Sequence, residues 1–188
     1  LIDPKFLINY PEFNIKKKSK HDIVFIDQSE NISDFLEIKK NSRAEGNYKF
    51  LKHIKKFCSL NKNLKLYFCL RNKYEKKELA QIKAFFSDTK IIISENNDQF
   101  SSYKIIQESK LIVTNYSTIG IEGLFMHIPV LFTNHLLDNE YSFLDNNLFQ
   151  LKCDNYKLFD STISLILRDY CTREKNLQNI IKNITYGN

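Results

Sequence analysis

Residues 111–132 read LIVTNYSTIGIEGLFMHIPVLF, and this stretch decides the expected fold of the whole chain. Residues 111–113 form a short apolar run that fits a buried strand. A polar break follows, and the segment from Ile119 to Met126 then has the composition of a helix. Pro129 ends that helix and leads into a second apolar run. The stretch predicts a βαβ unit, in which ligands usually bind at the turn after the first strand.

The rest of the chain continues this alternation of apolar runs and amphipathic segments. We expect strands over residues 22–27, 64–70 and 90–93, and helices over residues 47–60, 75–86 and 101–108. Alternating strands and helices favour the α/β class, here a Rossmann-like, doubly wound parallel sheet of about five or six strands in a single domain.

The two ends of the chain carry weaker patterns. Residues 1–20 are expected to form a basic linker segment, and residues 21–188 one Rossmann-like domain. Residues 135–150 predict a loop-rich region. Residues 160–183 predict one or two C-terminal helices, the first of them capped by Asp160 or Ser161.

The composition supports a sizeable core and a basic surface. Hydrophobic residues make up 43% of the chain, and 28 Lys and Arg against 22 Asp and Glu give a net charge of +6. An anionic partner is one explanation, and a general bias toward Lys, Asn, Ile, Phe and Tyr is the other. The lysines are scattered without an aromatic stripe, which argues against nucleic-acid binding. Residues 16–18 and Lys20 are predicted to be a solvated linker, with a contact to a phospholipid surface as the alternative.

Several kinds of site have no sequence signature. The four cysteines form no CxxC pair and have no histidine at metal-ligand spacing, so we expect reduced thiols and no metal site. His21, His53 and His135 are isolated in the sequence and receive no chemical role, and His127 is expected to be a loop residue. The GxGxxG, GxxxxGK(S/T) and GxSxG motifs are missing. No membrane-spanning run and no signal peptide are visible, so we expect a cytoplasmic location.

Three polar segments follow predicted strands, at residues 27–29, 71–73 and 116–118. Because the carboxyl ends of parallel strands meet at one edge of a sheet, these segments are expected to share one site. The helix that starts near Thr118 offers unpaired backbone N–H groups and the positive end of its dipole, which together favour phosphate. Glu122, one turn into the helix, can accept hydrogen bonds from the hydroxyls of a ribose or sugar. Alternatively, it is an ordinary first-turn carboxylate, stabilised by the helix dipole.

The other candidate side chains also have a binding role and a structural alternative. The hydroxyls of Ser117 and Thr118 can donate to phosphate, but either residue can also be only the helix N-cap. Gly120 allows the close approach of a ligand or of a neighbouring strand. Arg71 and Lys73 can neutralise phosphate oxygens or be ordinary surface charges.

The stretch from Ser109 to Gly123, followed by residues 127–131, resembles the donor-binding motif of GT-B glycosyltransferases. The likeness is greatest to bacterial enzymes that build capsule and other surface polysaccharides. It consists of the strand, the Ser-Thr turn, Gly120, Glu122 and Pro129-Val130.

The chain also departs from the pattern of that family. Residues 126–128 read Met-His-Ile where Gly-Lys is usual, and residues 71–73 read Arg-Asn-Lys where many relatives carry a Lys-x-His-Pro segment. Epimerases and glycerophosphate-type polymer transferases share the same scaffold.

The resemblance implies a role for each candidate residue. Ser117 and Thr118 would hold the diphosphate of the donor, and Glu122 would bind ribose or donor-sugar hydroxyls. Arg71 would offset phosphate charge, and Asp27-Gln28 would line the cleft between two domains. The resemblance names no catalytic base among these residues.

The resemblance also implies an activity and partners. The chain would be the donor half of a GT-B glycosyltransferase in surface polysaccharide synthesis, with a nucleotide-sugar donor and a saccharide or lipid-linked acceptor. An N-terminal acceptor domain or a second subunit would complete it, and it would need no cofactor or metal. Its expected location is cytoplasmic, with peripheral contact to the inner membrane. The alternatives are a polyol-phosphate transferase with a CDP-glycerol-type donor and a non-catalytic nucleotide-binding partner.

Overall fold

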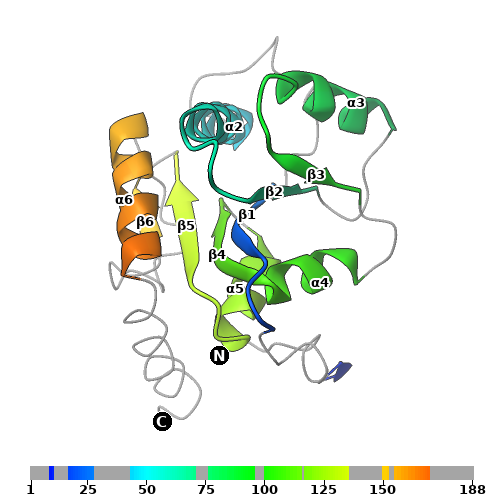
Figure 1. Cartoon of the computed structure of the whole chain (residues 1–188). Coiled ribbons are helices and arrows are strands. Elements are labelled where there is room, and N and C mark those ends of the chain that lie inside the picture. Colours follow the sequence, from blue (N-terminus) through cyan, green and yellow to red (C-terminus); the bar gives the residue numbers. More distant parts are fainter. Residues whose placement is uncertain are drawn as a thin grey trace.

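The computed structural model gives the arrangement of the chain in three dimensions (Figure 1). The predicted site residues Gln28, Arg71 and Lys73 and the chain beyond residue 169 lie outside the residues that it describes. The described residues are 9–10, 17–27, 43–70, 76–95, 100–115, 117–135, 150–152 and 155–169.

A six-stranded parallel sheet forms the centre of the fold, in the order β3-β2-β1-β4-β5-β6. Its strands are β1 His21–Ile26, β2 Leu66–Cys69, β3 Ile92–Ser94, β4 Ser109–Thr114, β5 Val130–Asn134 and β6 Gln150–Lys152. The sheet confirms the predicted class. The prediction of a loop-rich region over residues 135–150 was wrong at Gln150, where β6 begins.

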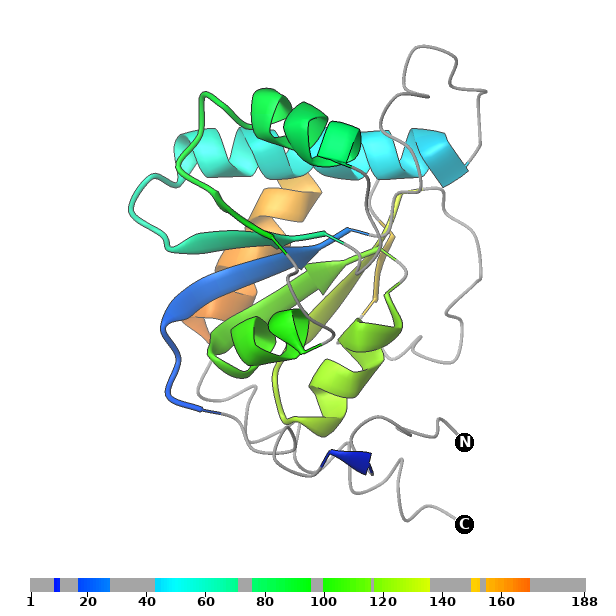
Figure 2. The same cartoon turned by 90° about the vertical axis from the view of Figure 1, so that its right-hand side faces the viewer.

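Helices cover both faces of this sheet, as a doubly wound fold requires (Figures 1 and 2). The helices are α2 Arg43–Leu60, α3 Lys76–Phe85, α4 Ser101–Gln107, α5 Thr118–Phe125 and α6 Tyr156–Arg168. Buried side chains of α2, α3 and α6 pack on one face, and those of α4 and α5 pack on the other. Two separate cores therefore hold the sheet between them.

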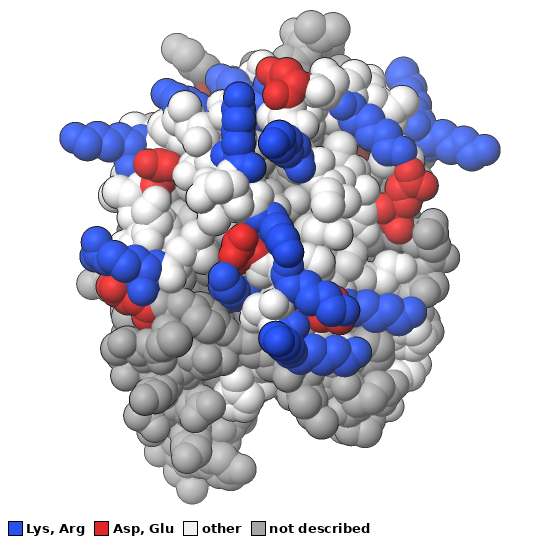
Figure 3. Space-filling model, in the orientation of Figure 1, with Lys and Arg blue, Asp and Glu red and all other residues white. Residues whose placement is uncertain are grey.

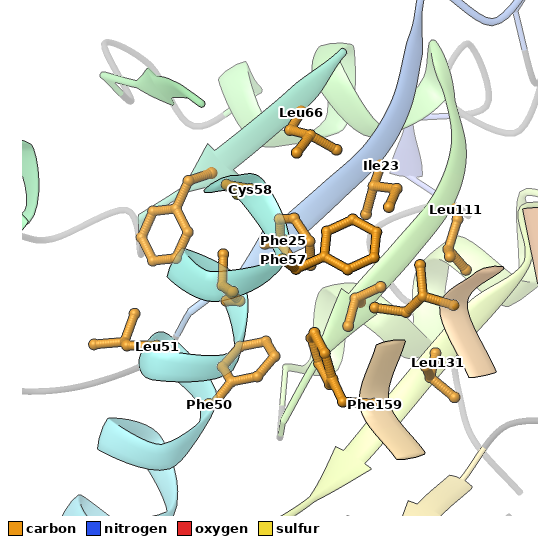
Figure 4. Close-up of a cluster of buried hydrophobic side chains, with 14 of the residues drawn as sticks. Ile23, Phe25, Phe50, Leu51, Phe57, Cys58, Leu66, Leu111, Leu131 and Phe159 are labelled. Atoms are coloured by element: carbon orange, nitrogen blue, oxygen red, sulfur yellow. The ribbon is translucent and has the colours of Figure 1, made fainter. Parts of the chain in front are cut away.

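The larger core is built from the apolar stripe that the helical spacing of α2 predicts. Phe50, Leu51, Ile54 and Phe57 recur at helical intervals and are all fully buried. They face the alternate side chains of β1 and β4 and meet Phe159 of α6 (Figure 4). Side chains of this size stabilise a fold by about 1.5–3 kcal/mol each when they leave water.

The smaller core depends on two glycines that bring α5 close to the sheet. A Cβ atom on Gly120 would lie 2.9 Å from Cγ2 of Thr114 and 3.0 Å from Cζ of Phe132. A Cβ atom on Gly123 would overlap Cδ1 of Ile112. Gly120 was predicted to allow the close approach of a ligand or of a neighbouring strand, and the packing shows the close approach of β4 and β5.

The C-terminal end of α5 is a Schellman motif with an unusual residue in it. The N–H of His127 donates to the carbonyl of Leu124, and the N–H of Ile128 donates to the carbonyl of Gly123. His127 takes the left-handed conformation that this motif needs, with φ at 58°. Glycine is the usual residue there because a side chain is strained in that region.

The ends of two helices differ from the prediction. α2 begins at Arg43, four residues before the expected start at Asn47. α6 begins at Tyr156, and its N-cap is Asn155, whose side chain accepts a hydrogen bond from the N–H of Leu158 at 3.0 Å. The predicted caps Asp160 and Ser161 were wrong, since both lie inside the helix.

Candidate functional site

Three strand ends lie side by side at the carboxyl edge of the sheet. Ile26, the last residue of β1, is in register with Cys69 of β2 and Thr114 of β4. Asp27 follows directly, is 4% exposed, and donates its backbone N–H to the carbonyl of Cys69. From β1 the chain winds toward β3 on one side, and from β4 it winds toward β6 on the other. Ligands of open α/β sheets bind at such a switch point.

The first turn of α5 begins at this switch point. Ser117 is the N-cap: its Oγ accepts a hydrogen bond from the N–H of Ile119 at 3.3 Å. Ser117 is 1% exposed, whereas the side chain of Thr118 is exposed. In this conformation the hydroxyl of Ser117 therefore acts as the helix N-cap, which was the structural alternative to phosphate binding. The helix presents its positive end, and the exposed hydroxyl of Thr118, at the carboxyl edge.

Glu122 lies on the side of α5 that faces α4. The hydroxyl of Tyr103 donates to Oε2 of Glu122 at 2.6 Å. Burial raises the pKa of Glu122, and the Tyr103 hydrogen bond partly opposes this. Burial and the same carboxylate raise the pKa of Tyr103. The hydrogen bond from Tyr103 therefore fixes Oε2 of Glu122, and with it the orientation of the whole carboxylate.

A polar cluster that was not predicted lies behind this turn, and all of its members except the half-buried His53 are buried. Asn115, Asn47, Thr133, His135 and His53 form a chain of hydrogen bonds between β4, β5 and α2. Asn115 is its centre: its Nδ2 donates to Asn47 Oδ1 at 3.1 Å, and its Oδ1 accepts from Thr133 Oγ1 at 2.7 Å. Nδ1 of His135 lies 3.2 Å from the same oxygen, and Nε2 of His135 lies 3.0 Å from Nδ1 of His53.

The geometry of this cluster assigns the proton positions on both rings. An amide oxygen only accepts, so His135 carries its proton on Nδ1 and donates to Asn115. Nε2 of His135 is then an acceptor for the N–H of His53. Burial, and after it the neighbouring His53, lower the pKa of His135 to about 3. Burial, with Lys52 next in effect, also lowers the pKa of His53. His135 is therefore neutral at pH 7.

The cluster fixes the backbone that leads into α5. Asn115 is two residues before Ser117, and its side chain is held by Asn47 of α2, Thr133 of β5 and His135 directly after β5. His53 and His135 are isolated in the sequence, but the fold brings them into contact, and Nε2 of His21 lies 3.8 Å from Glu108. Helical spacing could have shown the position of His53, which follows Phe50 by three residues on the buried face of α2. No local pattern connects it with His135.

Metal binding and thiol chemistry depend on how the described histidine, cysteine and acidic side chains are arranged. Within the ranges that the structure describes, no three His, Cys, Asp or Glu side chains gather where they could hold a metal ion. Cys58 and Cys69 are free and buried, and burial raises the pKa of each thiol to about 12. Thiols of this kind are unreactive at neutral pH. No described helix combines the length and apolar character needed to cross a membrane.

No protein-family model and no curated protein sequence matches the chain. Solved structures do match. A UDP-GlcNAc 2-epimerase from Neisseria meningitidis bound to UDP-GlcNAc aligns with a TM-score of 0.57 and 12% identity over 93% of this chain and 42% of that chain. The Methanocaldococcus jannaschii UDP-GlcNAc 2-epimerase in complex with UDP-GlcNAc and UDP aligns with a TM-score of 0.54 and 16% identity over 94% of this chain and 48% of that chain. TarM aligns with a TM-score of 0.59 and 13% identity over 92% of this chain and 33% of that chain.

These alignments define the class of the fold. The chain has the fold of one GT-B-like domain, with the Rossmann-like sheet that the sequence predicted. It spans from 33% to 48% of the length of the three structures. At identities of 12–16% the likeness is one of fold.

Proposed function

We propose that this chain is the nucleotide-sugar-binding domain of a GT-B glycosyltransferase that works in bacterial surface polysaccharide synthesis. The observation that carries the proposal is the switch point between β1 and β4, with α5 beginning directly behind it. Two structures with the same fold are described as bound to UDP-GlcNAc. The donor would bind at the carboxyl edge, with its diphosphate at the N-terminus of α5.

In this proposal each residue of the edge has a defined task. The positive end of the α5 dipole and the backbone N–H and hydroxyl of Thr118 bind phosphate oxygens, while the N–H groups of Ile119 and Gly120 donate to the side chain and the carbonyl of Ser117. Glu122, oriented by Tyr103, accepts hydroxyl hydrogen bonds from ribose or the donor sugar. Asp27 lies at the neighbouring strand end, and Arg71 adds positive charge. Stabilisation of the charge that develops on the leaving phosphate is the contribution that such groups make to sugar transfer.

The second domain of a GT-B enzyme would supply the acceptor and the catalytic base. We assign no catalytic base to this chain. Gln28 and Lys73 complete the set of proposed binding residues. The chain would bind the donor alone and transfer sugar only together with an acceptor domain or subunit.

Calorimetric titration of the chain with UDP, CDP, GDP and CMP tests the proposal. We expect a nucleoside diphosphate to bind, and Glu122→Gln to weaken it by about tenfold to a hundredfold, as for the loss of a charged hydrogen bond. Glu108→Gln, which makes the same charge change at the opposite edge, serves as the control. If no nucleotide binds, the donor-domain proposal is wrong.

The choice of nucleotide separates the remaining alternatives. Preferential binding of CDP or CMP would favour a polyol-phosphate transferase. Binding of a nucleotide without any transfer in the presence of the acceptor half would favour a non-catalytic partner. Ser117→Ala tests the first turn of α5, and Asn155→Ala is its matched control. Each removes one N-cap at a cost of about 1 kcal/mol, but only Ser117→Ala should lower nucleotide affinity.

A further inference from the structure

The amino ends of β1, β2 and β3 border an open hollow of about 430 Å³ at the edge opposite the candidate site. Lys20 lines it together with Lys62, Lys65 and Lys90, and we call the last three the amino-edge lysines. Lys62 and Lys65 lie in the connection from α2 to β2, and Lys90 lies in the connection from α3 to β3, so the fold brings these two segments together. Figure 3, which views the molecule from this side, shows lysine side chains gathered near the centre of the face.

The acidic groups on this edge are already paired. Asp22 accepts a hydrogen bond from Nζ of Lys110 at 2.7 Å, and Glu108 forms an ion pair with Lys20 at 2.8 Å. The amino-edge lysines form no ion pair with any residue in the described part of the chain. Within the described part of the chain these three charges therefore have no ion-pair partner, although Asp22 interacts electrostatically with Lys65, and Asp88, which is paired with Lys55, borders a second hollow with Lys62 and Lys90.

Exposed apolar side chains accompany these charges. Ile92 lines the same hollow and is 50% exposed. Leu60, the last residue of α2, is 65% exposed and precedes the turn that carries Lys62. Lysines around exposed aliphatic side chains suit the boundary between anionic headgroups and acyl chains, because each kind of side chain meets its own layer there.

We propose that this amino edge is a docking surface for an anionic phospholipid bilayer. Its charge complements acidic headgroups, and its exposed aliphatic groups can enter the layer beneath them. The candidate donor site lies at the opposite edge of the sheet and stays open to solution when the amino edge is docked. The inference does not depend on donor binding, since no residue is shared by the two surfaces.

Nucleic acid is a less suitable partner for this surface. Single-stranded nucleic acid is bound by aromatic side chains on which bases stack. The aromatic rings on this edge, His21 and Tyr67, instead contact each other, with centroids 4.1 Å apart, and both are half-buried. The surface offers charge and aliphatic groups without an aromatic platform.

Vesicle sedimentation with the whole chain tests the proposal. We expect binding to phosphatidylcholine vesicles that contain phosphatidylglycerol, weaker binding at high salt, and none to phosphatidylcholine alone. The triple variant Lys62→Gln/Lys65→Gln/Lys90→Gln should lose affinity on the order of a hundredfold, since each lysine near an anionic bilayer contributes about fivefold. Leu60→Gln should also lose affinity, by severalfold, at unchanged charge.

A matched triple variant separates a local surface from net charge. Lys76→Gln/Lys77→Gln/Lys157→Gln removes three exposed charges from the starts of α3 and α6 and should bind vesicles like the unaltered chain. Circular dichroism confirms the fold of each variant. Equal losses in the two triple variants, or absence of vesicle binding, would overturn the proposal. So would tighter binding to a single-stranded RNA oligomer that Leu60→Gln leaves unchanged.

Discussion

The neutral, buried His135 should make the stability of this protein depend on pH. In the folded chain burial and His53 hold its pKa at about 3, against 6.5 for an ordinary histidine. Between these values the unfolded chain binds more protons at this ring than the folded chain does. Stability therefore stays constant for this group above pH 6.5 and is lost as the pH falls below it.

The size of the effect follows from linkage. One proton contributes about 1.4 kcal/mol per pH unit, so lowering the pH to about 5 should cost about 2 kcal/mol in the free energy of unfolding. For a domain of this size that corresponds to a fall in Tm of about 4–8 °C. Glu122 acts in the opposite direction, because its raised pKa makes stability fall as the pH rises past 4.5.

Urea unfolding followed by far-UV circular dichroism between pH 5 and 8 measures this dependence. The variant His135→Gln removes this titration and leaves Glu122 in place, while His53, which contacts His135 and also has a lowered pKa, retains a titration of the same sign. Its stability should change less with pH than that of the unaltered chain, whatever its absolute value. His21→Gln, on the opposite edge, should keep most of the slope. Equal slopes for the unaltered chain and His135→Gln would refute the reasoning.

Three further substitutions test particular contacts. Gly120→Ala should destabilise the fold by about 1–3 kcal/mol, measured by urea unfolding, because its Cβ would press on the rigid ring of Phe132. His127→Gly should raise stability by about 1 kcal/mol, because glycine relieves the left-handed strain and removes a buried Nδ1 that has no partner among the described residues. Tyr103→Phe should raise the pKa of Glu122 further in a carboxyl NMR titration, because it removes the hydrogen bond that favours the charged form. Unchanged stability in Gly120→Ala or in His127→Gly would contradict the packing or the strain assigned to that position. An unchanged pKa of Glu122 in Tyr103→Phe would contradict the role of the Tyr103 hydrogen bond.

Local patterns predicted the elements whose sequence repeats at one period. The stripe from Phe50 to Phe57 gave α2, and the apolar run 111–113 gave the centre of β4. β6 was missed because its three residues, Gln-Leu-Lys, contain no apolar run and need only one neighbouring strand. The N-cap of α6 was missed because Asp160 and Ser161 are cap-forming residue types that lie within the helix, while Asn155 starts it.

The site was predictable where neighbours in sequence are neighbours in space, and where the ends of parallel strands meet at one edge of the sheet. Ser117 and Thr118 could be placed at a helix start because the turn and the helix are continuous. The pairing of His53 with His135 joins residues from α2 and the end of β5, and that contact follows from the sheet order. The amino-edge lysines meet for the same reason. Tertiary structure, and not residue type, decides which scattered polar groups act together.

The central claim is that a nucleoside diphosphate binds at the N-terminus of α5. An amide NMR titration of the isotopically labelled chain with UDP tests it most directly, since it reports which backbone N–H groups lie near the ligand. We expect the largest shift at Thr118, with smaller shifts at Ile119 and Gly120, whose N–H groups donate to Ser117, and we expect all of them to shrink in Glu122→Gln. Shifts confined to the amino edge, or none at all with UDP, CDP and GDP, would contradict it.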